Sequence, residues 1–270
     1  MPITIATFNV NSLRARLANV QDWLRLAKPD VALLQEIKCQ EHEFPQLEFQ
    51  SLGYHCAALG QKSYNGVAIL SRHKLDVVQR GLPGDDGDDH ARYMEADIEV
   101  PAEHTRDQQA QKLRVATIYL PNGNPVESEK YPYKLAWMKR LRQRAAELLK
   151  TEMPVVLGGD YNVCPTDDDV YDPAGWAEDA LCKPESRAHF RAIVNLGYTE
   201  AFRAVNSEIH RYTFWDYQAG RWQRDEGLRI DHLLLSPQAA DCLGDCQIDR
   251  YPRKQEKPSD HTPIWCRLDL

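Results

Sequence analysis

Short apolar runs recur along the whole chain and predict a protein rich in β-strands. The first run, residues 3–8, alternates between apolar and polar positions and contains β-branched residues, which is typical of a strand. Runs of the same kind predict further strands at residues 31–34, 66–71, 93–100, 113–120, 155–157, 212–215, 228–235 and 264–268.

Two segments instead repeat their apolar residues at helical spacing. The first follows Ser12, which we expect to cap the helix, and ends at a Lys-Pro pair before the second strand. The second and longest covers residues 133–150 and carries an apolar stripe. We expect three arginines of this helix to form a solvated face rather than a phosphate site: Arg140, Arg142 and Arg144.

Many strands separated by few helices favour two packed β-sheets with helices outside, and a single doubly wound sheet is the alternative. With 270 residues and a hydrophobic content of 43%, the chain can bury a sizeable core. The acidic residues 84–89 and the polar residues 101–112 are short enough to be surface loops, so no linker interrupts the pattern. We therefore expect one domain, residues 1–270.

Composition argues against several classes of protein. No apolar run approaches the ~18 residues of a membrane helix, and the chain enters its first strand without a signal peptide. The seven cysteines are odd in number and scattered, so we expect reduced thiols and a cytoplasmic protein. The formal net charge of −7 argues against broad electrostatic wrapping of nucleic acid, although a basic face could still contact phosphate.

Carboxylates, amides and one histidine gather in five short clusters, four of which follow a strand-like run. Hard oxygen ligands and an imidazole that converge from separate strand ends are what magnesium-assisted attack of water on a phosphate ester requires. The clusters are residues 8–11, 35–38, 158–162, 229–232 and 259–262.

Each cluster also has a simpler interpretation. Glu36 would be costly to bury alone, so it binds a cation, reaches a solvent edge or pairs with Lys38. Asp160 and Asn162 can point toward one edge, where a carboxylate accepts a proton from water and an amide donates to a phosphoryl oxygen. An Asx turn is the simpler alternative for this pair.

The dipeptide of Asp260 and His261 is weak by itself. Adjacent residues point in different directions, so Asp260 is expected to meet a cation or water. His261 then needs a carboxylate from elsewhere, for which Asp231 is the candidate, and an imidazolium held in this way can neutralise a phosphate. The chain has no serine nucleophile elbow, P-loop or dinucleotide fingerprint, so covalent serine catalysis has no support.

At these clusters the chain closely resembles the exonuclease III family of DNA repair nucleases, within the endonuclease, exonuclease and phosphatase superfamily. The resemblance implies a four-layer α/β sandwich of two packed mixed β-sheets flanked by helices, and dependence on Mg²⁺, with Mn²⁺ as a substitute. The implied activities are cleavage of duplex DNA 5′ to abasic (AP) sites, 3′-to-5′ exonuclease, and 3′-phosphatase or 3′-phosphodiesterase, in base excision repair. The matching segments are residues 8–14, 34–38, 64–68, 119–123, 158–162, 212–217, 227–236 and 257–263.

The resemblance also implies roles for single residues. The implied metal ligands and their supports are Asn9, Glu36, Asp160, Asn162, Asp260 and His261. The implied catalytic residues are Tyr119, Asp160, Asn162, Asp231 and His261, and Asn122 and His261 would contact phosphate or DNA. Asp160 would activate or orient the attacking water, and we treat Asp160, His261 and Tyr119 as a coupled set that supplies base and acid.

Phe214, Leu228 and Ile230 match the apolar pocket that the family uses for a flipped abasic sugar, and core packing is the alternative for all three. The chain departs from the family in two places. Ser12 replaces the usual glycine, and residues 167–185 are shorter and more acidic than the corresponding DNA-gripping region. The second departure leaves duplex affinity and the balance of activities open.

The sequence therefore predicts a magnesium-dependent nuclease that acts as a monomer, away from membranes, on double-stranded DNA with abasic sites or blocked 3′ ends. One alternative is a superfamily phosphatase acting on inositol phosphates, lipids or small phosphoesters, and another is a non-catalytic binding module. The first would favour a dense Lys/Arg cluster or an apolar membrane loop, and neither occurs in the sequence. The complete set of carboxylates, amide and histidine disfavours the second.

Overall fold

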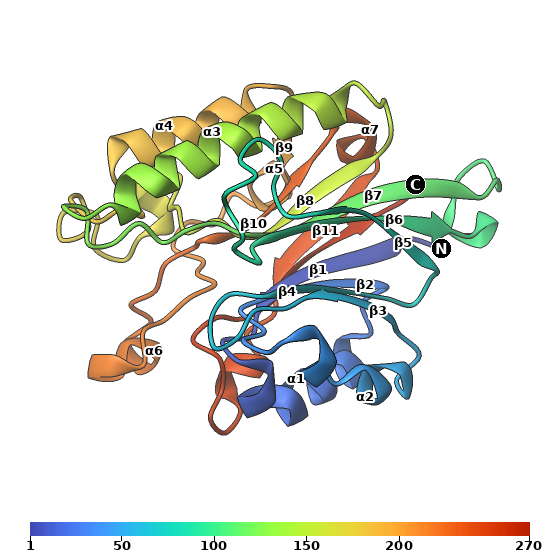
Figure 1. Cartoon of the computed structure of the whole chain (residues 1–270), viewed down its shortest axis with the longest axis horizontal. Helices are drawn as coiled ribbons and strands as arrows, with labels where there is room; N and C mark the ends of the chain where they lie inside the picture. The colour runs from blue at the N-terminus through green and yellow to red at the C-terminus, as the bar shows by residue number, and fades with distance from the viewer.

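A computed structural model describes residues 1–270 as two six-stranded β-sheets packed face to face, with helices outside them (Figure 1). The first sheet contains, in spatial order, β11 (Leu243–Ile248), β12 (Ile264–Leu268), β1 (Ile3–Asn9), β2 (Val31–Gln35), β4 (Val67–Ser71) and β3 (His55–Leu59). The second contains β5 (Leu75–Arg80), β6 (Tyr93–Val100), β7 (Gln111–Tyr119), β8 (Val155–Asp160), β10 (Asp231–Leu235) and β9 (Thr199–Glu200). Both sheets are mixed, because β1 pairs in parallel with β2 and β7 with β8.

Helices cover the outer faces of both sheets. The first sheet is covered by α1 (Leu13–Ala27) and α2 (Gln46–Gln50), and the second by α3 (Lys130–Leu149) and α4 (Pro184–Val194), which lie side by side (Figure 1). The short helices are α5 (Ala201–Val205), α6 (Arg221–Arg224), which projects at the lower left of Figure 1, and α7 (Pro237–Ala240). None of the helices combines the length and apolar character needed to cross a lipid bilayer.

Alternating side chains along the strands explain the four layers. In β1, Ile3 and Ile5 join the core between the sheets, whereas Phe8 packs toward α1. In β7, Val115 belongs to the same central core, whereas Ile118 packs with residues of α3. The predicted four-layer α/β sandwich is therefore confirmed, and the doubly wound sheet is excluded.

One predicted strand does not form, another begins later than predicted, and four strands were not predicted. Residues 212–215 form no strand, since Phe214 makes only isolated bridges to Leu228 and His261. The strand predicted over residues 228–235 begins only at Asp231. The strands β3, β5, β9 and β11 were missed because they are short or half-exposed, so polar residues interrupt their apolar pattern.

Two expectations about the helices are also wrong. Ser12 makes no side-chain capping hydrogen bond and adopts a φ of 83°, in the left-handed region that favours glycine. Arg140 and Arg144 are not simply solvated, because Arg140 pairs with Asp88 and Arg144 Nε lies 2.7 Å from the buried Glu95 carboxylate. These pairs attach α3 to the rest of the molecule, and among the three arginines only Arg142 is exposed.

Two consecutive glycines beside the polar clusters allow close packing, Gly158 against the facing sheet and Gly159 against the neighbouring strand of its own sheet. A Cβ at Gly158 would lie 2.6 Å from Leu33 Cδ1 in the facing sheet. A Cβ at Gly159 would lie 1.9 Å from the carbonyl oxygen of Ile118 in the neighbouring strand. Residues without side chains are therefore required just before Asp160, which ends β8.

Candidate active site

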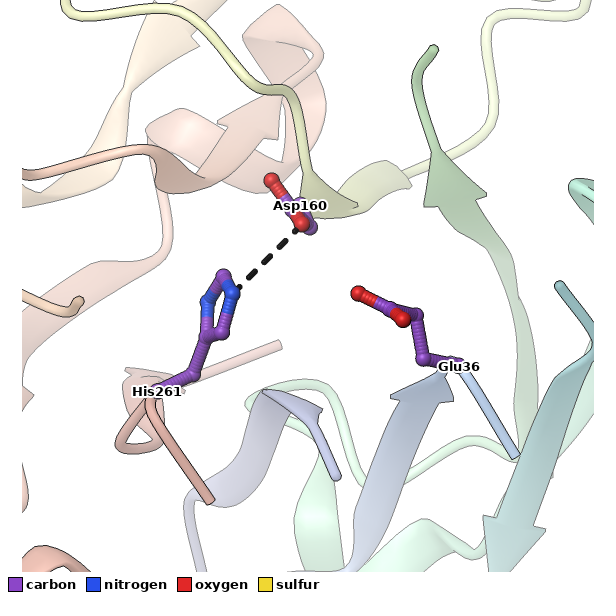
Figure 2. A group of neighbouring side chains, drawn as sticks. All are labelled: Glu36, Asp160 and His261. Atoms are coloured by element: carbon purple, nitrogen blue, oxygen red, sulfur yellow. Dashed lines mark ion pairs between the residues drawn. The ribbon is translucent and has the colours of Figure 1, made fainter. Parts of the chain in front are cut away.

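Strand ends from both sheets bring the polar clusters together at one edge of the sandwich. The side chains come from the end of β1, the residue after β2, the end of β8, the start of β10 and the loop before β12: Asn9, Glu36, Asp160, Asp231 and His261. Because β10 runs antiparallel to β8, Asp231 lies opposite Asp160. Figure 2 shows the side chains of Glu36, Asp160 and His261 pointing toward one another, and their ligand atoms lie within 4.8 Å of each other.

Glu36 is held by two neighbours. Its Oε1 accepts a hydrogen bond of 2.8 Å from Asn9 Nδ2, and its Oε2 lies 2.9 Å from Lys38 Nζ. Burial raises its pKa, but Lys38 and Asn9 outweigh burial, so the net pKa of Glu36 is lowered. The salt bridge with Lys38 that the sequence left as an alternative is therefore present, and the carboxylate stays ionised and faces the other two side chains.

Asp160, His261 and Asp231 form a buried chain. His261 Nδ1 lies 2.8 Å from Asp231 Oδ2, and His261 Nε2 lies 3.8 Å from Asp160 Oδ2. Burial lowers the pKa of His261, but the charges of Asp231 and Asp160 outweigh burial and raise it to about 10. Burial raises the pKa of Asp160 to about 7, and the neighbouring imidazolium opposes that rise. The carboxyl group of Asp160, which can accept a proton, therefore lies beside the protonated ring of His261.

Two amides lie next to Asp160. The Asn162 backbone N–H donates to Asp160 Oδ1 at 2.9 Å, and Asn162 itself has a φ of 47°. Its side-chain Nδ2 donates to the carbonyl oxygen of Leu120 at 2.9 Å, and its Oδ1 accepts from Asn122 Nδ2 at 3.1 Å. The side-chain amides of Asn122 and Asn162 are thus held in fixed orientations at the wall of the site. The contact between Asn162 and Asp160 is the Asx turn that is the simpler interpretation of this pair.

Tyr119 and Asp260 complete the polar wall. Burial and the nearby carboxylates of Glu36 and Asp160 hold the pKa of Tyr119 well above its usual range, so its hydroxyl keeps its proton. The Arg92 guanidinium lies 4.6 Å from the centre of the Tyr119 ring. Asp260 Oδ1 accepts from Asn11 Nδ2 at 3.0 Å, a contact that no sequence signal indicated.

A pocket of about 280 Å³ opens at this edge, and its polar wall includes Glu36, Tyr119, Asn122, Asp160, Asn162, Asp260 and His261. Phe214 and Ile230 contribute to its wall, whereas Leu228 is 1% exposed and lies behind them, bridged to Phe214. Wall residues that the sequence did not single out are Asn124, Trp176, Asp179, Leu181 and Asp216. Three of them, Trp176, Asp179 and Leu181, lie within the acidic stretch after β8, residues 167–185, which therefore forms part of the pocket wall.

The donor set fits a divalent cation. Glu36 and Asp160 offer hard carboxylate oxygens at the pocket, which suit Mg²⁺ or Mn²⁺. Asn9 turns its amide nitrogen toward both carboxylates while its Oδ1 accepts from Asn11, so it supports them in this orientation. A protonated imidazole has no lone pair for a cation, which favours phosphate contact over metal ligation for His261.

Comparison with known protein families identifies the family of this chain. A family model described as the endonuclease/exonuclease/phosphatase family matches residues 6–261. The chain belongs to this family. It is 33% identical to exodeoxyribonuclease III of Haemophilus influenzae, over 97% of this chain and 98% of that protein. The family resemblance inferred from the sequence motifs is thereby confirmed.

Solved structures of family members are similar over the full length. An AP endonuclease from Archaeoglobus fulgidus superposes with a TM-score of 0.91 at 36% identity and covers 99% of this chain and 100% of its own. The 3′ phosphatase NExo from Neisseria, solved with a product DNA hairpin, superposes with a TM-score of 0.92 at 38% identity and the same coverage. Proteins with this architecture therefore include an AP endonuclease and a 3′ phosphatase solved with a product DNA hairpin.

The acidic stretch after β8 neutralises its own cations. Lys183 Nζ lies 2.6 Å from Glu178 Oε2, and Arg187 Nη1 lies 2.8 Å from Asp167 Oδ1. The positive charges of Lys183 and Arg187 are thus both paired with carboxylates of this stretch. The short turn Asp167–Asp169 is in turn anchored, because the buried Asp169 accepts from Arg229 at 2.9 Å.

Proposed function

We propose that this chain is a Mg²⁺-dependent DNA repair nuclease that incises duplex DNA 5′ to abasic sites and removes nucleotides, phosphates or phosphodiester remnants from 3′ ends. The observation that carries the proposal is the buried chain of Asp231, His261 and Asp160 facing Glu36 across one pocket. The similarity to exodeoxyribonuclease III, to an AP endonuclease and to a 3′ phosphatase supports the substrate.

Glu36 and Asp160 would hold the Mg²⁺ ion, with Asn9 supporting both carboxylates and Asp260 and Asn162 close enough to act directly or through water. Bound Mg²⁺ would act as a Lewis acid that stabilises the negative charge developing on the phosphate. Mn²⁺ prefers the same kind of ligands and is the expected substitute. The cation would also offset the negative charge that the pocket carboxylates present to an incoming phosphate.

The residues of the chain itself then position and protonate the reactants. The His261 imidazolium would bind a non-bridging oxygen of the scissile phosphate, and Asp231 holds its ring in place. Asp160 would orient the attacking water and accept its proton, while Asn162 and Asn122 donate hydrogen bonds to the transition state. The water oxygen would bond to phosphorus as the P–O3′ bond breaks, and the leaving O3′ would take a proton from the coupled set of Asp160, His261 and Tyr119, so that a 3′-hydroxyl and a 5′-phosphate remain.

The apolar side of the pocket would receive a sugar without a base. Phe214 and Ile230 present no hydrogen-bonding groups, and Leu228 supports Phe214 from behind. A normal nucleotide would leave its base edge unpaired there, whereas an abasic sugar loses nothing and is cheap to extrude. Tyr119 lies in the same pocket, where its hydroxyl would face the phosphate.

We further propose that residues 1–270 act as one catalytic domain and as a monomer, because every residue of the site comes from one chain. All seven cysteines are free thiols, which supports work in the cytoplasm.

The test is cleavage of a labelled duplex with one abasic-site analogue, beside an undamaged duplex and a duplex with a 3′-phosphate, each with Mg²⁺ and with EDTA. We expect Mg²⁺-dependent incision at the lesion and release of the 3′-phosphate. Glu36→Ala and His261→Ala should abolish both with the fold intact, whereas Glu43→Ala, a carboxylate outside the pocket, should not. Wild-type turnover in either site variant would contradict the site, and inactivity on all three DNAs would favour a small phosphoester as substrate.

A further inference from the structure

We propose that Lys134, a buried lysine of α3, is a positioning residue that holds the phosphate-facing amides of Asn122 and Asn162 in their reactive orientation. Its side chain does not reach the pocket. It reaches instead the backbone of the loops that carry those amides. The inference rests on the proposed function and names a residue on which that function depends.

The lysine amine joins three separate loops. Lys134 Nζ donates to the carbonyl oxygen of Asn162 at 2.6 Å, and to those of Asn122 and Ala180 at 3.0 Å each. The first two follow β8 and β7, and the third lies in the stretch that supplies Asp179 and Leu181 to the pocket wall. One ammonium group therefore fixes three walls of the same pocket.

The number of contacts matches the number of protons. An ammonium has three N–H donors, and each of the three carbonyl oxygens accepts one. The side chain is 0% exposed, so water cannot replace any of these bonds. Burial lowers the pKa of Lys134 to about 7 against the charges of Asp179 and Asp160, and the three accepting carbonyl oxygens favour the charged ammonium form. A group so costly to bury requires compensation, and the three carbonyl oxygens provide it.

Gly123 leaves room for this lysine. Its φ is 91°, and a Cβ there would lie 2.7 Å from Lys134 Cδ and 3.2 Å from Ala180 Cβ. The stem of the lysine therefore passes directly over the backbone between Asn122 and Asn124. A second contact closes the same assembly, because Asn124 Oδ1 accepts from the Ala180 backbone N–H at 3.1 Å.

Asn162 needs such a support. Its backbone φ of 47° is unfavourable for a residue with a side chain, and its own amide both donates to Leu120 and accepts from Asn122. Without the lysine, its carbonyl oxygen would be buried without a partner, and the loop would relax to pair it. The amide would then move relative to the phosphate while the cation site at Glu36 stays in place.

The first test replaces Lys134 by Met, which keeps the stem and removes the three donors. On a duplex with a 3′-phosphate we expect kcat to fall on the order of tenfold to a hundredfold, with little change in KM. Mn²⁺ affinity, measured by calorimetry, should fall far less than kcat, because Asn9 still holds the carboxylates of Glu36 and Asp160. A matched control is Arg144→Met, which removes another paired cation of α3 away from the pocket and should leave kcat unchanged.

A double-mutant cycle separates positioning from general destabilisation. If Lys134 acts through Asn122 and Asn162, adding Lys134→Met to the double variant Asn122→Ala/Asn162→Ala should slow that variant no further. Multiplied losses would overturn the proposal, as would a Lys134→Met enzyme with wild-type kcat. Should Lys134→Met fail to fold, Lys134→Gln retains two donors and enters the same cycle with the same two outcomes.

Hydrogen exchange provides a readout without substrate. Lys134→Met should lower amide protection in residues 120–124, 161–164 and 179–183 together, whereas Arg144→Met should not. Unchanged protection in these loops would overturn the role of Lys134. Inactivity of the wild-type chain on DNA would contradict the proposed function instead, so the two failures are distinguishable.

Discussion

The positive charge of His261 depends most on the carboxylate of Asp231. Asp231 lies 2.8 Å from its Nδ1, and together with Asp160 it outweighs the burial that would otherwise discharge the ring, so the pKa of His261 rises to about 10. The ring is therefore charged at neutral pH and loses its proton only as the pH rises toward 10. The same shift stabilises the folded state below the ordinary histidine pKa of ~6.5, and this contribution is lost as the pH rises through about 10.

Asp231→Asn should therefore narrow the alkaline side of the pH profile. With the Asp231 carboxylate gone, only Asp160 and Asp260 still oppose the effect of burial, so the pKa of His261 should fall from about 10. We expect the alkaline limb of kcat/KM to move to lower pH by at least about one unit. NMR titration of the His261 ring checks the assignment, and Asp216→Asn, another acidic residue of the pocket wall, is the control. An unmoved limb and an unmoved ring titration would contradict the role of Asp231.

Phe214 tests the pocket for an abasic sugar. It lines the pocket, and its ring centre lies 5.1 Å from that of His261. Phe214→Ala should reduce abasic-site incision by roughly tenfold more than 3′-phosphate release, because only the first reaction needs the flipped sugar to be enclosed. Steady-state assays on the two labelled duplexes measure the ratio, with Phe44→Ala as a control outside the pocket. Equal losses on both substrates would identify Phe214 as ordinary core.

At the scale of single residues, the sequence predicted the side chains that carry the chemistry but not the residues that hold these side chains in place. Glu36 and Asp160 follow apolar runs, and His261 lies in a family motif before the last strand, so their convergence could be anticipated. Lys134 could not be, because its helix position shows only a polar residue, and its three partners are distant in sequence. Trp176 was missed for the same reason, since nothing local to it indicates that its segment folds back over the pocket.

At the level of elements, the acidic stretch after β8 limits how strongly the protein can hold DNA. Its Lys183 and the following Arg187 are both paired with acids of the same stretch, Glu178 and Asp167. Such pairs leave little net positive charge to displace counterions from a duplex. We therefore expect substrate affinity to be limited here by internal neutralisation rather than by a lack of basic residues.

Glu178→Gln should release Lys183 and improve DNA binding. We expect KM for duplex DNA to fall by a few-fold at low salt, and its dependence on salt concentration to become steeper by up to about one unit of log–log slope. A salt series of KM measures both, with Glu127→Gln as a control that removes an acid without a paired cation. A KM that does not change at any salt concentration would show that Lys183 does not approach the DNA.

The elements themselves were predicted as far as their side chains alternate. Buried strands such as β6 and β7 have continuous or alternating apolar residues and were found, whereas β5 and β11 lie at sheet edges with polar faces and were not. The segment around Phe214 has the composition of a strand, but it makes only isolated bridges. Composition alone does not determine whether such a segment finds a pairing partner.

At the scale of the whole molecule, the separation of the two sheets determines the geometry of the site. Glu36 belongs to the first sheet and Asp160 to the second, so their distance depends on how closely the sheets pack. Gly158 permits that packing, because it faces Leu33 across the interface and Leu233 beside it. Stability and catalysis should therefore respond together to a change at this glycine.

Gly158→Ala tests this coupling. The new Cβ would lie 2.6 Å from Leu33 Cδ1 and 2.8 Å from Leu233 Cδ2, so both side chains must shift and the sheets must separate slightly. Overpacking of this kind costs about 1–3 kcal/mol, which for a chain of this length lowers Tm by roughly 2–10 °C. We also expect a fall in kcat, since Asp160 would move away from Glu36. Gly244→Ala is the matched control, because its nearest neighbour lies 3.4 Å away near the edge of the first sheet. A lower Tm with an unchanged kcat would show that the site tolerates movement between the sheets.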